Sequence, residues 1–229
     1  MWVIKNIIFA TFFIFITVFL SIIAIFLRFS QKYLIGIYKI WGKIILFLAD
    51  KIYGIKYQIV GLKNIKDEPC IIASKHQSMW ETIIFLVLFD KISYILKSEL
   101  LKIPFYGWHL KAMGMISVNR KGGLKAMRKM LEDAKKRLID GHKIVIFPQG
   151  TRTPFNSSAK DYPYHFSFIS LYHEGFKVIP VSLDSGKFWP KGMFSKKKSG
   201  TIKMTIMPAI VDNLDNVEFK KELQLKIEN

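Results

Sequence analysis

The hydrophobic positions divide the chain into an apolar N-terminal stretch and a longer region of short alternating runs. Residues 7–27 form about 21 consecutive positions with neither a charge nor a proline. As a helix that rises ~1.5 Å per residue, such a stretch matches the ~30 Å hydrocarbon core of a bilayer. A cleavable signal peptide would have a shorter apolar core followed by small residues, and neither feature is present. The pattern therefore predicts a membrane-spanning helix over residues 7–27.

A second apolar stretch, residues 33–49, is interrupted by Lys39 and Lys43. Its apolar residues recur at helical spacing, which is typical of an amphipathic helix in the membrane interface. A helix packed on the core of a domain accounts for the pattern equally well. Basic residues are more frequent after the first stretch than before it, which places the following chain in the cytoplasm. We therefore expect a membrane anchor over residues 1–50 and a domain over 51–229 on the cytoplasmic face of the inner membrane.

After the anchor, short runs rich in isoleucine and valine alternate with charged stretches of helical length. This alternation is typical of an α/β fold with a mostly parallel central sheet flanked by helices. The clearest helix covers residues 122–139, and Gly141 follows it as the residue that ends it. The sequence predicts about seven strands, at residues 57–60, 70–74, 92–96, 116–118, 144–147, 178–183 and 201–207.

Composition favours anionic lipids over nucleic acid as partners. The chain has 35 lysines and arginines against 17 acidic residues, a net charge of +18, so its surface attracts anions. Its 51% of hydrophobic residues is high for a nucleic-acid binder and ordinary for a membrane protein. No recognition helix, ribonucleoprotein motif or zinc spacing is visible, so we expect no nucleic acid. Cys70 is the only cysteine, which excludes an intrachain disulfide, and we expect neither a metal nor a cofactor.

His76 and Glu81 follow the predicted strand at residues 70–74, and sites in α/β sheets form at the carboxyl ends of strands. On one continuous helix these two side chains would point roughly 140° apart, so they meet only if a turn lies between them. With Ser78 at the start of a helix over 79–88, Glu81 could orient His76 for taking a proton from a hydroxyl. The Ser-x-x-Glu spacing is also that of a capping box, which taken alone is the commoner case.

Two further clusters follow predicted strands. Residues 147–152 read Phe-Pro-Gln-Gly-Thr-Arg. In them Gly150 lets the backbone approach an anion, and Arg152 offers a planar fork suited to phosphate. Residues 114–120 end another strand in Arg120. Taken singly, the first cluster is more commonly an ordinary Pro-Gly turn, and the second is usually a solvated arginine.

In this order and spacing, the clusters resemble the motifs of the glycerolipid acyltransferase superfamily, specifically the bacterial 1-acyl-sn-glycerol-3-phosphate acyltransferases. The resemblance covers roughly residues 61–184. The matches are His76 to Glu81 with the family's His-x-x-x-x-Asp, residues 114–120 with its Gly-x-Ile and Val-x-Arg, residues 147–152 with Phe-Pro-Glu-Gly-Thr-Arg, and residues 178–181 with Val-Ile-Pro-Val.

The resemblance implies that His76 is the base that deprotonates the acceptor hydroxyl and that Glu81 orients it. The hydroxyl would then attack an acyl thioester directly, without a covalent acyl-enzyme. The implied acceptor is lysophosphatidic acid, acylated at its sn-2 hydroxyl to give phosphatidic acid, and the implied donor is acyl-CoA or acyl-acyl carrier protein. The implied ligands of the acceptor are Arg120, Gln149, Gly150, Thr151 and Arg152.

This chain differs from the family motifs at three places. Glu81 replaces Asp and can accept the same hydrogen bond, whereas Gln149 replaces Glu and removes a negative charge. Residues 164–167 read Tyr-His-Phe-Ser where relatives tend to carry Lys-x-Gly, which puts the acceptor in question. The alternatives are acylation of another lysolipid, such as a lyso-ornithine lipid, or a catalytically silent membrane-binding protein. The basic region 187–198 is expected to favour a polyanionic donor, with its lysines at 196–198 in a solvated turn.

Overall fold

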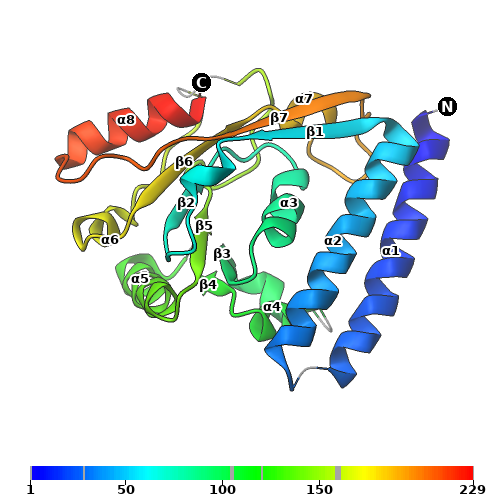
Figure 1. The fold of residues 1–229 in the computed structure, drawn as a ribbon, viewed down its shortest axis with the longest axis horizontal. Coiled ribbons are helices and arrows are strands. Elements are labelled where there is room, and N and C mark those ends of the chain that lie inside the picture. Colours follow the sequence, from blue (N-terminus) through cyan, green and yellow to red (C-terminus); the bar gives the residue numbers. More distant parts are fainter. Residues whose placement is uncertain (1, 28, 104–105, 120, 158–160, 229) are drawn as a thin grey trace.

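The computed structural model describes residues 2–27, 29–103, 106–119, 121–157 and 161–228 (Figure 1). Its centre is a seven-stranded sheet in the order β1-β7-β6-β2-β5-β3-β4. The strands are β1 (Ile55–Val60), β2 (Ile71–Ser74), β3 (Ile92–Lys97), β4 (Ile116–Val118), β5 (Lys143–Ile146), β6 (Val178–Leu183) and β7 (Gly200–Ile206). All seven predicted strands are confirmed, each to within two residues at either end.

Five of the strands run in one direction. β2 pairs in parallel with both β5 and β6, and β3 pairs in parallel with β5 and β4. β7 runs antiparallel to β6, and β1 lies parallel to β7, so these two strands run opposite to the rest. β2, β5 and β6 are buried on both faces, as parallel strands between helical layers are. The prediction of a mostly parallel sheet is confirmed, and the carboxyl ends of β2, β5 and β6 meet at one edge.

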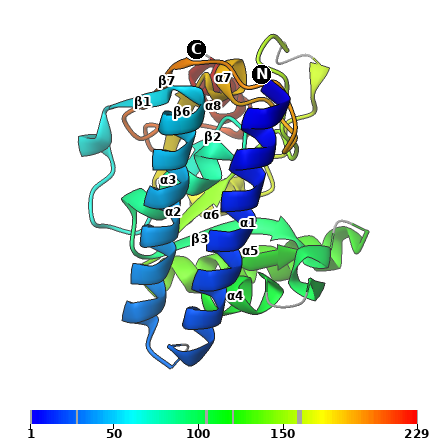
Figure 2. The ribbon, with the colours of Figure 1, turned by 90° about the vertical axis from the view of Figure 1, so that its right-hand side faces the viewer.

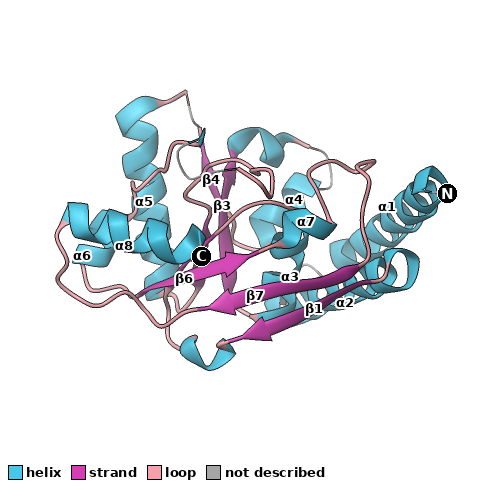
Figure 3. Cartoon of the chain, turned by 90° about the horizontal axis from the view of Figure 1, so that it is seen from above, coloured by secondary structure: helices cyan, strands magenta, loops and turns pink. Residues whose placement is uncertain are grey.

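Helices cover both faces of the sheet (Figures 1 and 3). The face that carries Ile72 and Val145 packs against α1 (Trp2–Phe26), α2 (Gln31–Tyr53) and α3 (Trp80–Leu88). The opposite face, with Ile71 and Ile144, packs against α5 (Gly123–Ile139), α6 (Ile169–His173) and α8 (Asn216–Glu228). The shorter helices are α4 (Tyr106–Ala112), α7 (Ser185–Phe188) and the 3-10 turns η1 (Leu62–Asn64) and η2 (Ser98–Lys102). Neighbouring strand residues thus feed two separate cores.

The predicted helix over residues 122–139 is confirmed as α5. Gly141 follows it with φ +85°, a left-handed conformation that glycine adopts without steric cost. α3 begins at Trp80, and the backbone N–H of Trp80 donates to Ser78 Oγ at 3.1 Å. The helix therefore starts one residue later than the predicted 79–88, with the Ser78 hydroxyl satisfying one of its first amides.

The helices α1 and α2 form an antiparallel hairpin along one side of the domain (Figure 2). α1 is long and apolar enough to cross a membrane. Its first turns pack on the domain: Phe9 is fully buried, and its ring centroid lies 5.3 Å from those of both Tyr53 and Trp189. The side-chain amide of Asn6 donates to the carbonyl oxygen of Phe194 at 3.0 Å. The beginning of α1 is therefore tied to the loop that precedes β7.

That loop corrects one prediction from the sequence. Lys196 and Lys198 are exposed as expected, but Lys197 is buried. Its ammonium donates to the carbonyl oxygen of Met193 at 2.7 Å and lies 5.1 Å from the centre of the Tyr53 ring. Burial lowers the pKa of Lys197 to about 8. The prediction that Lys197 lies in a solvated turn is wrong, because aromatic rings cover this side chain where α1 packs on the loop.

Candidate functional site

The turn between β2 and α3 brings His76 and Glu81 into contact. His76 Nδ1 lies 2.9 Å from Glu81 Oε1. His76 lies in the turn and Glu81 in the first turn of α3, which is the arrangement the spacing required. Glu81 is fully buried, whereas the imidazole of His76 keeps some contact with solvent. The sequence thus predicted the meeting of these two side chains correctly.

The carboxylate of Glu81 makes both kinds of contact that the sequence left open. Besides the imidazole, its Oε1 accepts hydrogen bonds from the backbone N–H groups of Gln77 and Ser78, each at 2.6 Å. Its Oε2 accepts a bond from the hydroxyl of Ser185 at 2.8 Å. Four donors compensate for the burial of the carboxylate. The capping contacts and the contact with His76 are therefore not alternatives, because one carboxylate makes all of them.

The ring of His76 is held on several sides. It stacks on Phe147, with ring centroids 3.9 Å apart. The backbone N–H of His76 donates to Gln149 Oε1 at 2.8 Å, and its carbonyl oxygen accepts from the N–H of Thr153 at 2.8 Å. Because a carboxylate only accepts, Nδ1 carries a proton, and in the neutral tautomer Nε2 has a lone pair. Within the described part of the chain Nε2 has no partner, so it is free to accept a proton from a ligand.

His76 lies on the wall of a large cavity of about 1130 Å³. The cavity extends from the helical hairpin to α5, and most of its lining is aliphatic, aromatic or methionine. Three cations line it, Lys97, Arg152 and Lys191, and none of the described lining residues is acidic. An anionic group attached to apolar chains fits such a cavity, because the cations attract the charge and the walls bury the chains.

Residues of the Phe-Pro-Gln-Gly-Thr-Arg segment, 147–152, lie on the wall of the cavity. Gly150, Thr151 and Arg152 line the cavity together with His76. Gly150 has φ +66°, and an added Cβ would lie 2.9 Å from His165 Cδ2, so both conformation and space require glycine here. Arg120, the remaining arginine of the predicted site, lies outside the described residues.

Gln149 does not line the cavity, although it was predicted as an acceptor ligand. Its side chain is almost fully buried, and its Nε2 donates to Glu228 Oε1 at 3.1 Å. The same carboxylate accepts a bond from the hydroxyl of Tyr164, and its Oε2 forms an ion pair with Lys75 at 2.8 Å. The amide of Gln149 therefore connects the backbone of His76 to the partly buried carboxylate of Glu228 on α8.

Sequence reasoning missed Ser185, Thr153 and Glu228. Ser185 follows β6, which is the neighbour of β2, so the rule that pointed to His76 could have found it as well. Thr153 follows the third motif directly, and its hydroxyl donates to the carbonyl oxygen of His76 at 3.2 Å. Glu228 carries no local signal, because its partners are far away in the sequence. Of the divergent segment 164–167, Tyr164 joins the Glu228 cluster, and all four residues line the cavity.

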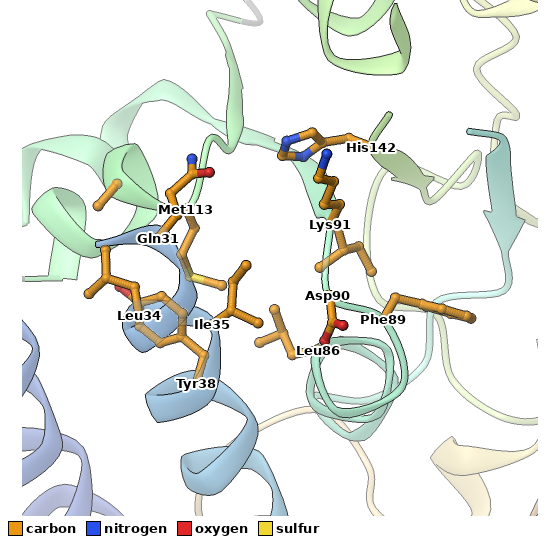
Figure 4. A pocket seen from close by; sticks show the side chains of 12 residues that line it. Gln31, Leu34, Ile35, Tyr38, Leu86, Phe89, Asp90, Lys91, Met113 and His142 are labelled. Carbon is orange, nitrogen blue, oxygen red and sulfur yellow. The ribbon is translucent and has the colours of Figure 1, made fainter. Parts of the chain in front are cut away.

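A second, much smaller pocket lies beneath the first turns of α2 (Figure 4). Leu34, Tyr38 and Met113 point into it, with His142 and Lys91 at its rim (Figure 4). Its volume of about 30 Å³ is the space of about one water molecule. It is too small for a lipid or a cofactor, whereas the cavity at His76 is large enough for a lipid.

Comparison with known proteins places the chain among lipid acyltransferases. Residues 56–184 match the model of the family described as Acyltransferase. The chain is 35% identical over 173 residues to the 1-acyl-sn-glycerol-3-phosphate acyltransferase of Pseudomonas aeruginosa. This match covers 74% of the chain and 65% of that protein. It is 32% identical over 184 residues to the protein of the same name from Borreliella burgdorferi, covering 79% of this chain and 70% of that one. The chain spans between about half and two thirds of the length of the first curated relatives that it matches.

A solved structure shares the fold. The crystal structure of PlsC, the 1-acyl-sn-glycerophosphate acyltransferase of Thermotoga maritima, superimposes with a TM-score of 0.78. The match covers 100% of this chain and 95% of that chain at 23% sequence identity. The likeness confirms the predicted α/β fold with its N-terminal helices.

Proposed function

Because this chain belongs to the acyltransferase family, we propose that it transfers a fatty acyl group from a thioester donor to the sn-2 hydroxyl of 1-acyl-glycerol-3-phosphate. The product is phosphatidic acid, an intermediate of phospholipid synthesis. The observation that carries the proposal is the contact of 2.9 Å between His76 and Glu81 on the wall of a cavity that is apolar and lined by cations. The names of the Pseudomonas and Borreliella relatives support the choice of acceptor.

In the proposed reaction, Nε2 of His76 takes the proton of the acceptor hydroxyl while the hydroxyl oxygen attacks the thioester carbonyl. The buried carboxylate of Glu81 stabilises the imidazolium that forms at that moment. The tetrahedral intermediate then collapses, the carbon–sulfur bond breaks, and the imidazolium returns its proton to the departing thiolate. The stacking on Phe147 and the backbone contacts keep the ring in place, so little reorganisation is required.

The acceptor's phosphate is assigned to the cationic part of the cavity. Arg152 lines the wall beside His76, and its guanidinium suits a phosphate group. Lys191 adds a second positive charge to the same cavity, and we keep Arg120 in the proposed set on the strength of its motif. The apolar walls toward α1 and α2 bury fatty chains.

The experiment that tests the function uses the full chain purified in detergent. A panel of lysolipids is offered with acyl-CoA and with acyl-acyl carrier protein, and the products are identified by mass. Transfer to lysophosphatidic acid in clear preference to neutral lysolipids supports the proposal. Transfer to a lyso-ornithine lipid, with none to lysophosphatidic acid, replaces it by the alternative acceptor.

We also propose that the hairpin of α1 and α2 binds the protein to the cytoplasmic face of the inner membrane. Large apolar side chains are exposed along most of α1, among them Phe12, Phe15 and Phe19. A lipid phase is the environment that covers such a surface. The bonds from Asn6 to the carbonyl oxygens of Phe194 and Ser195 keep the start of α1 beside the catalytic domain. A fully spanning α1 would carry Asn6 to the opposite face and break these contacts.

We therefore replace the spanning arrangement by a hairpin that lies within one leaflet. In that arrangement Lys5 and Lys32, near the two ends of α1, both reach headgroups on the same face. Cysteines introduced at these two positions test it, against a low background because the single natural cysteine is buried. Neither should react with a membrane-impermeant thiol reagent in intact cells, and both should react after permeabilisation. Labelling of position 5 from outside would restore the spanning helix.

A further inference from the structure

A partly buried carboxylate lies behind the turn that carries His76. Glu228, on the last turn of α8, has a side chain only 20% exposed. Its Oε2 pairs with Lys75, and its Oε1 accepts from Gln149 and Tyr164. Burial, together with the hydrogen bond to Glu228, raises the pKa of Tyr164 far above its usual range, so its hydroxyl remains a donor. Glu228 is thus a charge compensated by three groups around the site.

This carboxylate fixes the orientation of the Gln149 amide. A carboxylate accepts hydrogen bonds only, so it selects the Nε2 of Gln149 as its neighbour. The Oε1 of Gln149 must then face the other way, where it accepts the backbone N–H of His76 at 2.8 Å. With the amide reversed, two donors would meet at His76 and two acceptors at Glu228. The charge of Glu228 therefore determines which atom is presented to His76.

The bond between Gln149 and the backbone of His76 is one of several that hold this residue. Glu81 holds its Nδ1, and Thr153 holds its carbonyl oxygen. Gln149 holds its backbone N–H, and Lys75, the preceding residue, is held by Glu228 directly. Glu228 thus acts on the turn from two directions, through the amide of Gln149 and through the ion pair with Lys75.

We propose that Glu228 is a positioning residue for His76, which acts through Gln149 and Lys75 and forms a coupled pair with Gln149. The proposal rests on the proposed function, since positioning matters only if His76 is the base. It explains the glutamine at a position where the family motif usually has glutamate. A glutamate at 149 would place two carboxylates in contact at the distance of 3.1 Å that now separates Gln149 Nε2 from Glu228 Oε1, and like charges so close disfavour both ionised forms.

Exchanging the two side chains should preserve the network. In the double variant Gln149→Glu with Glu228→Gln, a carboxylate oxygen at position 149 accepts the N–H of His76. The amide at position 228 donates one N–H to the second oxygen and the other to the hydroxyl oxygen of Tyr164, whose bond reverses direction, and its carbonyl oxygen accepts from Lys75. The number of charges is unchanged. Each single variant, by contrast, brings together two carboxylates or two amides that cannot satisfy the same partners.

The test is a double-mutant cycle on the full chain, with kcat, KM and melting temperature measured for each variant. We expect each single variant to lower kcat, Gln149→Glu by about tenfold or more, with the KM for lysophosphatidic acid changed less than about threefold. The exchanged double variant should return kcat to within about threefold of wild type. Glu222→Gln is the matched control, because Glu222 lies on the same helix and, among the described residues, forms its ion pair with Lys226 on the outer side of α8.

Several outcomes overturn the proposal. One is a Gln149→Glu variant with wild-type kcat, and another is a double variant whose loss is the product of the two single losses. A fall in kcat of the same size in Glu222→Gln would also contradict it, since that would be a general effect of charge on α8. If the wild type transfers no acyl group to any lysolipid, the proposed function fails. The melting temperatures then still decide the coupling, which requires both single variants to melt lower and the double variant to recover.

Discussion

The turn at His76 and the helical hairpin at the start of the chain are stabilised in opposite ways. Around the turn, hydrogen bonds from four separate parts of the protein converge, namely α3, α7, the loop after β5 and α8. The hairpin packs along one side only and leaves much of the apolar surface of α1 uncovered. The protein itself therefore determines the geometry of the turn, whereas the proposed membrane would cover the exposed side of the hairpin.

Because of this difference, mutations in the turn and mutations in the hairpin should have different consequences. Substitutions in the turn should change the chemistry and leave membrane binding intact. Substitutions in the hairpin should change attachment or stability and leave the reactivity of His76 nearly unchanged. The predictions below test that separation, from the largest expected effect to the smallest.

Replacing His76 by alanine should have the largest effect, because it removes the only proposed acceptor for the hydroxyl proton. General-base catalysis contributes ~10²- to 10⁴-fold, so kcat should fall by about that factor. The variant should stay folded and bind membranes like the wild type, since the described contacts of the imidazole are with Phe147 and Glu81 and not with the hairpin helices. Initial rates, vesicle flotation and thermal melting check the three expectations. Turnover close to wild type would show that His76 is not the base.

Replacing Glu81 by glutamine should reduce kcat by about a hundredfold while stability changes by about 1 kcal/mol or less. The amide oxygen can still accept the bonds from the N–H groups of Gln77 and Ser78 and from Nδ1 of His76. The amide nitrogen can donate to the hydroxyl of Ser185, which then accepts. Only the negative charge that stabilises the imidazolium is lost.

The structure makes Glu81→Gln a more specific test of the charge of Glu81 than the sequence alone suggested. Capping survives the substitution, so a large loss of stability is not expected even if Glu81 also serves the helix start. A variant with normal kcat would mean that the charge of Glu81 does not assist proton transfer. Glu81→Ala, which removes all four bonds, is the comparison that shows the structural contribution.

Replacing Arg152 by alanine should raise the KM for lysophosphatidic acid about 10- to 100-fold, the loss of a charge-assisted contact of ~1.5 to 3 kcal/mol. Lysine should restore binding only in part, because it keeps the charge without the planar fork. The KM of the acyl donor should change little. Steady-state kinetics with each substrate varied in turn makes the distinction. A rise confined to the donor's KM would assign Arg152 to the thioester carrier instead.

The sequence predicted the strands and the meeting of His76 with Glu81 because both depend on local rules. Isoleucine-rich runs mark buried strands, and a turn after β2 was the only way to bring the two side chains together. Helices α4, α6 and α7 escaped prediction because they contain only 7, 5 and 4 residues, too few to show a periodicity. The positions of Gln149 and Glu228 escaped it because tertiary structure alone brings α8 to the turn.

The smallest predicted effect concerns Lys197, a cation buried where the hairpin meets the domain. Its folded-state pKa of about 8 lies below its ordinary value of 10.5. Between these pH values the unfolded chain binds a proton that the folded protein does not, so this residue makes the folded state more stable as pH rises. Below pH 8 both states are protonated and the penalty is constant. The contribution of Lys197 therefore grows more favourable from pH 8 to 10.5.

The variant Lys197→Met tests this contribution, because methionine fills the space between the rings of Phe9, Tyr53 and Trp189 without a charge. Its melting temperature minus that of the wild type should fall by a few degrees as pH is raised from 8 to 10.5. Lys196→Met, at the exposed neighbouring position, should show no such trend. Activity near neutral pH should stay close to wild type, since the hairpin junction makes no contact with His76. A difference in melting temperature that stays constant with pH would show that Lys197 is charged between those rings and that the junction tolerates a buried cation.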